Sequence, residues 1–260
     1  MTSEPPRSRL LRVPVSSLIE GEGMLPEQAA RYAIRVHRLV PGDRFVLFDP
    51  DVQLEADAEL IATEGGGRRG KAAVRARVRV GPARPPSVKA TRDVTLVQAL
   101  AKGAKMDAVV RDATELGVAR IVVATCAHSV RRGAERSDAA RRWRRIAVEA
   151  ARQCGRGDAP RVEAAKPLAA LLPEYSPAAT GCLGLCMDPT GEDSVGALLE
   201  SSDPEDPVVA IVGPEGGLSA DELGLARAEG YRIARLGPFV MRTETVCAAV
   251  LGAILAQGSR

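Results

Sequence analysis

The chain has 260 residues, of which 45% are hydrophobic and 27% charged, and its formal net charge is +3. This composition is ordinary for a soluble globular protein, and the length allows one large or two modest domains. No apolar run approaches the roughly 20 residues that span a bilayer, and the first ten residues lack the apolar core of a signal peptide. We therefore expect a cytoplasmic protein without a membrane partner.

Cysteine and histidine usage argues against a disulfide framework and against a metal site. The chain has five cysteines, an odd number, and two histidines. Disulfide-stabilised folds use paired cysteines in short secreted chains. Cys182 and Cys186 are spaced CxxxC inside an apolar strand-like run, which is typical of core residues, and two histidines offer few further zinc ligands. We expect neither a disulfide framework nor a bound metal.

Basic residues are concentrated in the first part of the chain. Residues 1–160 contain 29 lysines and arginines against 19 aspartates and glutamates, whereas residues 161–260 contain 7 against 14. Such a split suggests that one part of the molecule faces a polyanion. Only five of the 36 basic residues are lysine. This reflects either a general bias toward arginine or the suitability of its planar guanidinium group for binding phosphate.

Short strand patterns dominate residues 1–80, and a small β-barrel is the economical interpretation. The expected elements are strands at residues 10–15, 44–48, 56–61 and 73–80 and one helical segment at residues 26–39. Arg75 and Arg77 alternate with small or apolar residues, so they lie on one face of a strand, which is either merely solvated or binds phosphate. Residues 81–92, rich in proline, form a linker.

After the linker the pattern changes to alternating strands and helices. A strand at residues 94–98, a helix at 105–116 and a strand at 121–124 form a βαβ unit, which predicts a parallel sheet with a right-handed crossover. Further expected elements are helices at residues 137–154, 167–172, 193–200 and 243–257 and a strand at 181–187. The arginine-rich face of helix 137–154 is either solvated or directed at RNA.

Two glycine-marked loops follow strands near the end of the chain. A strand at residues 208–212 stops at GPEGG (213–217), and Ser219 and Glu222 form a capping box that starts a helix. A second strand, at 231–236, also stops at a glycine and a proline. Because ligands of open parallel sheets bind at the carboxyl ends of strands, we predict a pocket here. The first loop alone could equally be a tight turn.

The two loops together resemble one protein family. GPEGG followed by LGPFVMRTET (236–245) is similar to the bacterial 16S ribosomal RNA uridine-N3 methyltransferase family (RsmE), which belongs to the SPOUT class of knotted methyltransferases. The segments RYAIRVHRLVPGDRFVLFDPD, KGAKMDAVVRDATELGVARI and RWRRIAVEAARQCGR resemble other parts of the same family. The chain departs from the family pattern at Leu218, where phenylalanine is usual, and at Phe239, where an arginine is common.

The resemblance implies both a fold and an activity. The implied fold is α/β, with a PUA-like β-barrel RNA-binding domain over residues 1–80, the linker 81–92, and a SPOUT methyltransferase domain over 93–260 that ends in a trefoil knot. The implied activity is transfer of a methyl group from S-adenosyl-L-methionine to N3 of a specific uridine in the 16S rRNA of the small ribosomal subunit. The family also implies a homodimer.

Methylation at N3 requires particular chemistry. The N3 proton must leave, and negative charge then develops on the flanking carbonyl oxygens, so the site needs a proton acceptor and a nearby cation. Our hypothesis is that Arg242 stabilises the uridine anion, while Glu244 or Glu215 helps to remove the proton or orients Arg242. Each glutamate could equally be structural, as a helix cap or as the ion-pair partner of Arg242.

The resemblance also assigns residues to the cofactor and to RNA. The cofactor set is Met187, Val212, Gly213, Pro214, Glu215, Gly216, Leu236, Gly237, Val240, Met241 and Thr245. For RNA, the resemblance singles out Lys102, Lys105 and Arg156. The RNA set is completed by Arg131 and Arg132, from the arginine-dense segment, and by Arg75 and Arg77, from the strand face. Met187 and the following Asp188 form the expected third wall of the pocket.

Three alternatives stay open from the sequence. Another SPOUT enzyme could methylate a ribose 2′-hydroxyl or guanine N1 with the same cofactor loops. A nonenzymatic RNA-binding protein would keep the basic face but would not need two glycine loops with Arg242 between them. A nucleotide-dependent oxidoreductase would need a GxGxxG after its first strand, and the sequence has none.

Overall fold

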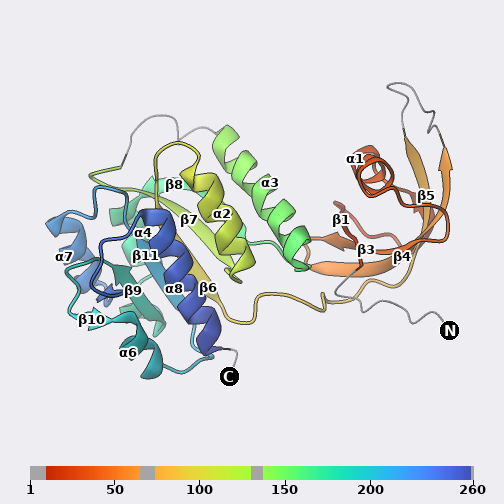
Figure 1. Cartoon of the computed structure of the whole chain (residues 1–260). Helices are drawn as coiled ribbons and strands as arrows, with labels where there is room; N and C mark the ends of the chain where they lie inside the picture. The colour runs from red at the N-terminus through yellow and green to blue at the C-terminus, as the bar shows by residue number, and fades with distance from the viewer. Residues whose placement is uncertain (1–9, 65–73, 130–136, 259–260) are drawn as a thin grey trace. The chain divides into compact units, whose positions relative to one another are not determined.

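The computed structural model describes residues 10–64, 74–129 and 137–258, and the chain divides into two compact units (Figure 1). The first unit consists of Met1–Lys89 and Ala151–Ala159, and the second of Ala90–Ala150 and Pro160–Arg260. Over the described ranges, no helix is both long enough and apolar enough to cross a bilayer.

The first unit contains a five-stranded sheet with the strand order β1-β3-β4-β5-β2. Its elements are β1 (Arg12–Pro14), β2 (Gly21–Met24), α1 (Glu27–Arg31), the π-helical turn η2 (Tyr32–Val36), β3 (Arg44–Asp49), β4 (Leu54–Glu64) and β5 (Arg75–Val80). β1 is parallel to β3, and the other pairs are antiparallel. The helical segment expected over 26–39 is therefore shorter, and its second half is π-helical.

The alternating pattern of β5 separates two faces of this sheet. Arg75 and Arg77 are exposed, whereas Ala76 and Val78 are buried, as the two-residue period of a strand requires. The buried side packs with Phe45, Leu47 and Leu60 and with small residues of α1. Burial of these apolar side chains fixes the register of the strands.

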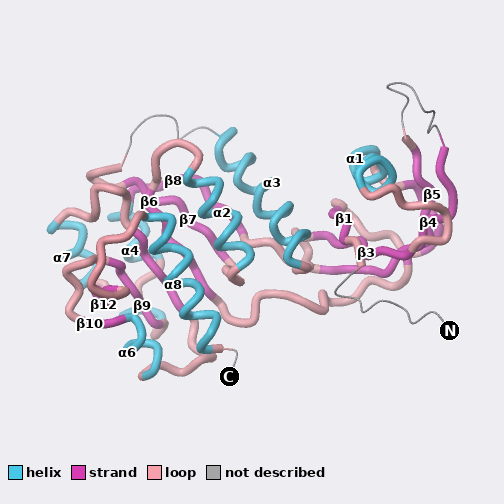
Figure 2. The backbone as a smooth tube through the Cα atoms, in the orientation of Figure 1, coloured by secondary structure: helices cyan, strands magenta, loops and turns pink. Residues whose placement is uncertain are grey.

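The second unit contains seven parallel strands in the order β10-β12-β9-β11-β6-β7-β8 (Figure 2). Its strands are β6 (Val94–Ala99), β7 (Arg120–Thr125), β8 (Arg161–Pro167), β9 (Leu183–Met187), β10 (Asp193–Ser194), β11 (Val208–Val212) and β12 (Arg232–Arg235). Its helices, including one that continues into the first unit, are α2 (Lys105–Glu115), α3 (Ser137–Cys154), α4 (Leu168–Glu174), α5 (Pro177–Thr180), α6 (Val195–Glu200), α7 (Ala220–Ala228) and α8 (Thr243–Gln257). The α/β class and the parallel sheet that the sequence predicts are confirmed.

Helices cover both faces of this sheet. α2, α3, α6 and α8 pack on one face, where Met106 and Leu251 are buried with Val208 and Val212 of β11. α4 and α7 pack on the other face, with Val209 and Ile211. β11 is therefore buried on both faces, which explains why its sequence is a continuous apolar run.

The register of the central strands brings three loops together. Val212 at the end of β11 pairs with Met187 at the end of β9, and Met187 also pairs with Ala234 of β12. Since the strands are parallel, the chain leaves all three at the same edge of the sheet. The loops that follow them, including both glycine loops, meet there.

Candidate functional site

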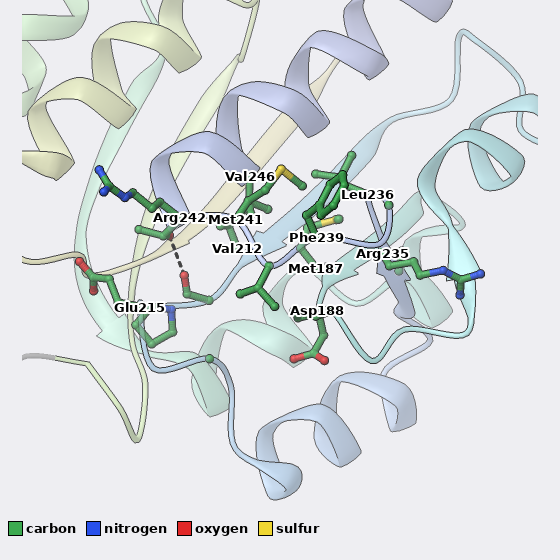
Figure 3. Close-up of a pocket in the computed structure, with 18 residues that line it drawn as sticks. Met187, Asp188, Val212, Glu215, Arg235, Leu236, Phe239, Met241, Arg242 and Val246 are labelled. Atoms are coloured by element: carbon green, nitrogen blue, oxygen red, sulfur yellow. Dashed lines mark hydrogen bonds between the residues drawn. The ribbon is translucent and has the colours of Figure 1, made fainter.

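A cavity of about 330 Å³ lies where the loops after β9, β11 and β12 meet (Figure 3). Its lining consists of Met187, Asp188, Pro189, Val212, Gly213, Pro214, Glu215, Gly217, Ala234, Arg235, Leu236, Gly237, Phe239, Val240, Met241, Arg242, Thr243 and Val246. Figure 3 shows Arg242 and Glu215 on one side of this pocket and Leu236 and Phe239 on the opposite side. Arg235 is drawn beside Leu236 with its side chain directed away from the pocket, and Asp188 lies between the two sides.

Most of the residues that the sequence assigns to a cofactor line this pocket. Gly216 and Thr245 do not. A Cβ atom at Gly216 would come within 2.9 Å of the Cβ of His128, so Gly216 instead permits close packing against that residue. Thr245 is exposed on the first turn of α8. Gly237 lines the pocket with a φ of 143°, which residues with a side chain rarely adopt, so the turn after β12 requires glycine.

Several lining residues were not assigned to the site from the sequence. They are Pro189, Gly217, Ala234, Arg235, Phe239, Thr243 and Val246, whereas Asp188 was expected at the pocket wall beside Met187. Position was the available signal, because the unassigned residues lie at the ends of β9 and β12, in the loops after β11 and β12, or in the first turn of α8. Asp188 accepts hydrogen bonds at Oδ1 from the Thr190 backbone N–H (2.8 Å) and hydroxyl (2.6 Å), which fix its orientation at the pocket wall.

A buried polar contact joins the GPEGG loop to the start of α8. The Thr243 hydroxyl donates to the Gly213 carbonyl at 2.7 Å and accepts from Gln98 Nε2 at 3.0 Å. Thr243 and Gln98 are 4% and 0% exposed. Because buried hydrogen bonds are costly to break, this contact holds the loop and the helix start in one arrangement.

The two candidate catalytic glutamates both contact Lys105. The Lys105 ammonium lies 3.0 Å from Glu215 Oε1 and 3.4 Å from Glu244 Oε2. Hydrogen bonding to Glu215, and then to Glu244, raises the pKa of Lys105. Partial burial alone would raise the pKa of Glu215, but hydrogen bonds from its own backbone N–H, from Lys105 and from the Lys102 N–H outweigh burial and lower it. Neither glutamate is paired with Arg242 among the described residues.

The described residues include no group of three or more histidine, cysteine, aspartate or glutamate side chains placed to hold a metal ion. Arg235 donates to the carbonyls of Gly191 and Glu192, both at 2.6 Å, so its guanidinium group is engaged outside the pocket.

Comparison with known proteins identifies the family. A family model described as RNA methyltransferase domain matches residues 88–255. The ribosomal RNA small subunit methyltransferase E of Mycobacterium bovis is 32% identical over 226 residues, which are 86% of this chain and 82% of the relative. The chain belongs to the ribosomal RNA small subunit methyltransferase E family.

Solved structures of methyltransferases share the fold. A methyltransferase E from Neisseria gonorrhoeae bound to S-adenosyl methionine superposes with a TM-score of 0.82 at 24% identity, over 95% of this chain and 98% of that one. A methyltransferase from Legionella pneumophila in complex with the cofactor SAM gives a TM-score of 0.79 at 26% identity, with the same coverage of both chains. The structural similarity therefore covers nearly the whole length of each chain.

The residues that the sequence assigns to RNA binding fall into different environments. Arg131 and Arg132 lie outside the described residues. Arg156 is 4% exposed and forms an ion pair with Asp158 at 2.7 Å within the first unit, so its guanidinium group is not presented to solvent. The Lys102 side chain is exposed, whereas Lys105 is engaged by two carboxylates.

The exposed face of β5 carries the other RNA candidates. Arg75 and Arg77 both lie on this face. The neighbouring Arg79 is held by Glu22 at 2.9 Å and Glu59 at 3.8 Å, which neutralise it. Arg77 has no ion-pair partner among the described residues and is the more available cation for phosphate.

Proposed function

We propose that the protein methylates N3 of a specific uridine in 16S rRNA of the small ribosomal subunit, with S-adenosyl-L-methionine as the methyl donor. The observation that carries the proposal is the pocket where three parallel strands end, with Arg242 and Glu215 together on one side. Membership of the family supports ribosomal RNA as the substrate class. The volume and the charged lining of the pocket support S-adenosylmethionine as the cofactor.

The lining residues fit the cofactor. The volume of about 330 Å³ is within the range of small-molecule sites. The glycine loops bring backbone groups to the pocket, where they would bind adenine and ribose, and Met187, Leu236 and Val246 supply apolar contacts. The carboxylate of Asp188 complements a ligand with a sulfonium and an ammonium group. When bound, S-adenosylmethionine supplies an electrophilic methyl group.

Arg242 is the group best placed to stabilise the uridine anion. Arg242 lines the pocket at the N-cap of α8 and is exposed to solvent. It has no ion-pair partner among the described residues. Loss of the N3 proton puts charge on the flanking carbonyl oxygens, and a guanidinium group beside them lowers the energy of that anion. Glu244 and Glu215 are the candidate proton acceptors.

We further propose the finer architecture of the family for this chain. The five-stranded sheet of the first unit would be a PUA-like barrel that binds RNA, and the segment containing both glycine loops would form the trefoil knot. α8 is apolar nearly all round, which supports pairing with a second copy in a homodimer. We also propose a cytoplasmic location, which a ribosomal RNA substrate supports.

The proposal is tested by methyl transfer from labelled S-adenosylmethionine to small ribosomal subunits that lack the modification. We expect the label to appear in 16S rRNA. Protein-free 16S rRNA, tested as a second substrate, shows whether the enzyme acts on the assembled subunit or on the naked RNA. Label in neither substrate, with cofactor still bound, would redirect the proposal to another RNA. A failure to bind the cofactor would refute the assignment of the pocket.

A further inference from the structure

Lys105 lies where three elements of the second unit meet. It is the first residue of α2, and its ammonium contacts Glu215 of the GPEGG loop at 3.0 Å and Glu244 of the first turn of α8 at 3.4 Å. The three side chains are only 33%, 25% and 24% exposed. Glu215 Oε1 also accepts from the Lys102 backbone N–H at 3.1 Å. One cation thus connects the cofactor loop with the helix start.

This ionic contact has a buried counterpart. The hydrogen bonds of Thr243 to Gly213 and Gln98 connect the same loop and the same helix start through the interior. Arg242 immediately precedes Thr243 and lies two residues before Glu244. The backbone that carries Arg242 is therefore fixed to the cofactor loop by two separate contacts.

The charge balance does not fit a phosphate contact at Lys105. One ammonium and two carboxylates sum to a net charge of −1, so the two carboxylates beside Lys105 would repel an approaching phosphate. Lys102 differs, because its side chain is exposed and has no ion-pair partner among the described residues. The two lysines, which the sequence groups together, therefore have different roles.

Glu215 is also poorly suited to accept the substrate proton. Its Oε1 is already occupied by two donors, from Lys105 and Lys102. Despite partial burial, its pKa is lowered by these and by its own backbone N–H, and a general base works best with a pKa near the operating pH. The ionised state that Lys105 stabilises is the state that holds the loop.

We propose that Lys105 is a positioning residue that fixes the GPEGG loop against the start of α8, so that Glu215 anchors the cofactor loop and does not accept the N3 proton. The proposal rests on the proposed function, since it assigns roles within the same pocket. Lys105 would therefore act on the reaction indirectly, by setting the positions of Arg242 and of the GPEGG loop that lines the cofactor pocket.

The first test is binding of S-adenosylmethionine, without RNA, by titration calorimetry. We expect Lys105→Met to weaken binding by roughly fivefold or more, because two carboxylates lose their shared counter-ion. Lys105→Arg, which keeps the cation, should recover most of the affinity. Lys166→Met is the matched control, since it removes a lysine–glutamate ion pair of 3.0 Å outside the pocket. Circular dichroism shows whether each variant is folded.

Unchanged cofactor affinity in Lys105→Met, with a raised KM for the ribosomal substrate, would overturn the proposal in favour of an RNA contact. The ionic contact can also be measured without cofactor or RNA, by a double-mutant cycle of Lys105→Met and Glu215→Ala, each of which removes the contact, in urea unfolding. Additive effects there would likewise overturn it. Because this cycle needs no ligand, its result is separate from any failure of the proposed function.

The role of Glu215 is tested by Glu215→Gln in single-turnover methyl transfer with saturating cofactor. A glutamine oxygen still accepts from Lys102 and Lys105, so we expect the rate to fall by less than about tenfold and its pH profile to keep its shape. A loss of about a hundredfold or more, with the alkaline rise of the profile abolished, would identify Glu215 as the proton acceptor.

Discussion

Four charged side chains line the pocket, and each has a different environment. Arg235 is bound to backbone carbonyls, Glu215 to Lys105 and Lys102, and Asp188 to Thr190. Arg242 has no ion-pair partner among the described residues. A side chain already engaged by the protein must break those contacts to serve a substrate, so Arg242 is the group most available for the uridine.

Arg242→Ala is therefore expected to reduce turnover far more than cofactor affinity. Removing one donor to a developing oxyanion costs about 10²–10³ in kcat, whereas the cofactor keeps its loops. Single-turnover rates and calorimetric titration of S-adenosylmethionine measure the two quantities. A variant with near-normal turnover would eliminate this role for Arg242.

Asp188→Asn should weaken S-adenosylmethionine more than S-adenosylhomocysteine. An asparagine oxygen still accepts from Thr190, so the loop is retained and only the charge is lost, and the sulfonium cofactor should lose roughly threefold to tenfold in affinity. Glu192→Gln, an exposed carboxylate outside the pocket lining, is the control. Equal losses for the two ligands would contradict an electrostatic role.

The positions of residues at the pocket were predictable from the sequence only where they follow from a local motif. GPEGG and the segment around Arg242 located the pocket, because loops at neighbouring strand ends must meet. The ion pairs of Lys105 were not predictable, since both carboxylates are more than a hundred residues away along the chain and helix α2 had no apparent connection to them. Burial of Arg156 likewise depends on Asp158 and on packing that spacing does not reveal.

At the scale of elements, the start of α8 and the GPEGG loop behave as one structural piece. Thr243→Val keeps the shape of the side chain but leaves the Gly213 carbonyl and Gln98 without their partner. We expect a loss of about 1–3 kcal/mol in the free energy of unfolding, measured with urea. Thr245→Val, at an exposed neighbouring position, should change stability by less than about 0.5 kcal/mol. Equal effects would refute the structural role of this contact.

Strands were predictable where burial imposes a pattern. β11 is a continuous apolar run because helices cover both of its faces, and β5 alternates because one of its faces is exposed. β2 is exposed throughout with the sequence GEGM, and β8 is mostly half-buried with charged residues and a final proline. Neither has a periodic apolar signal, and only pairing with neighbouring strands makes them strands.

At the scale of the molecule, the excess of basic charge in residues 1–160 is the feature that a ribosomal RNA substrate would use. Not every arginine in it contributes equally, because some are neutralised locally. Arg77→Gln should lower the slope of log affinity against log salt by about one unit, whereas Arg79→Gln, already paired with two glutamates, should change it less. Filter binding to 16S rRNA over a salt series measures both, and identical slopes for Arg77→Gln and the wild type would count against an RNA-binding face on β5.

The measurement that tests the central claim most directly is nucleoside mass spectrometry of 16S rRNA after reaction. Small subunits lacking the modification are incubated with the protein and S-adenosylmethionine, and the rRNA is digested and mapped. We predict N3-methyluridine at a single site, and none with the Arg242→Ala variant over the same time. A methyl group on a ribose 2′-oxygen or on guanine would contradict the assigned chemistry while leaving the cofactor pocket in place.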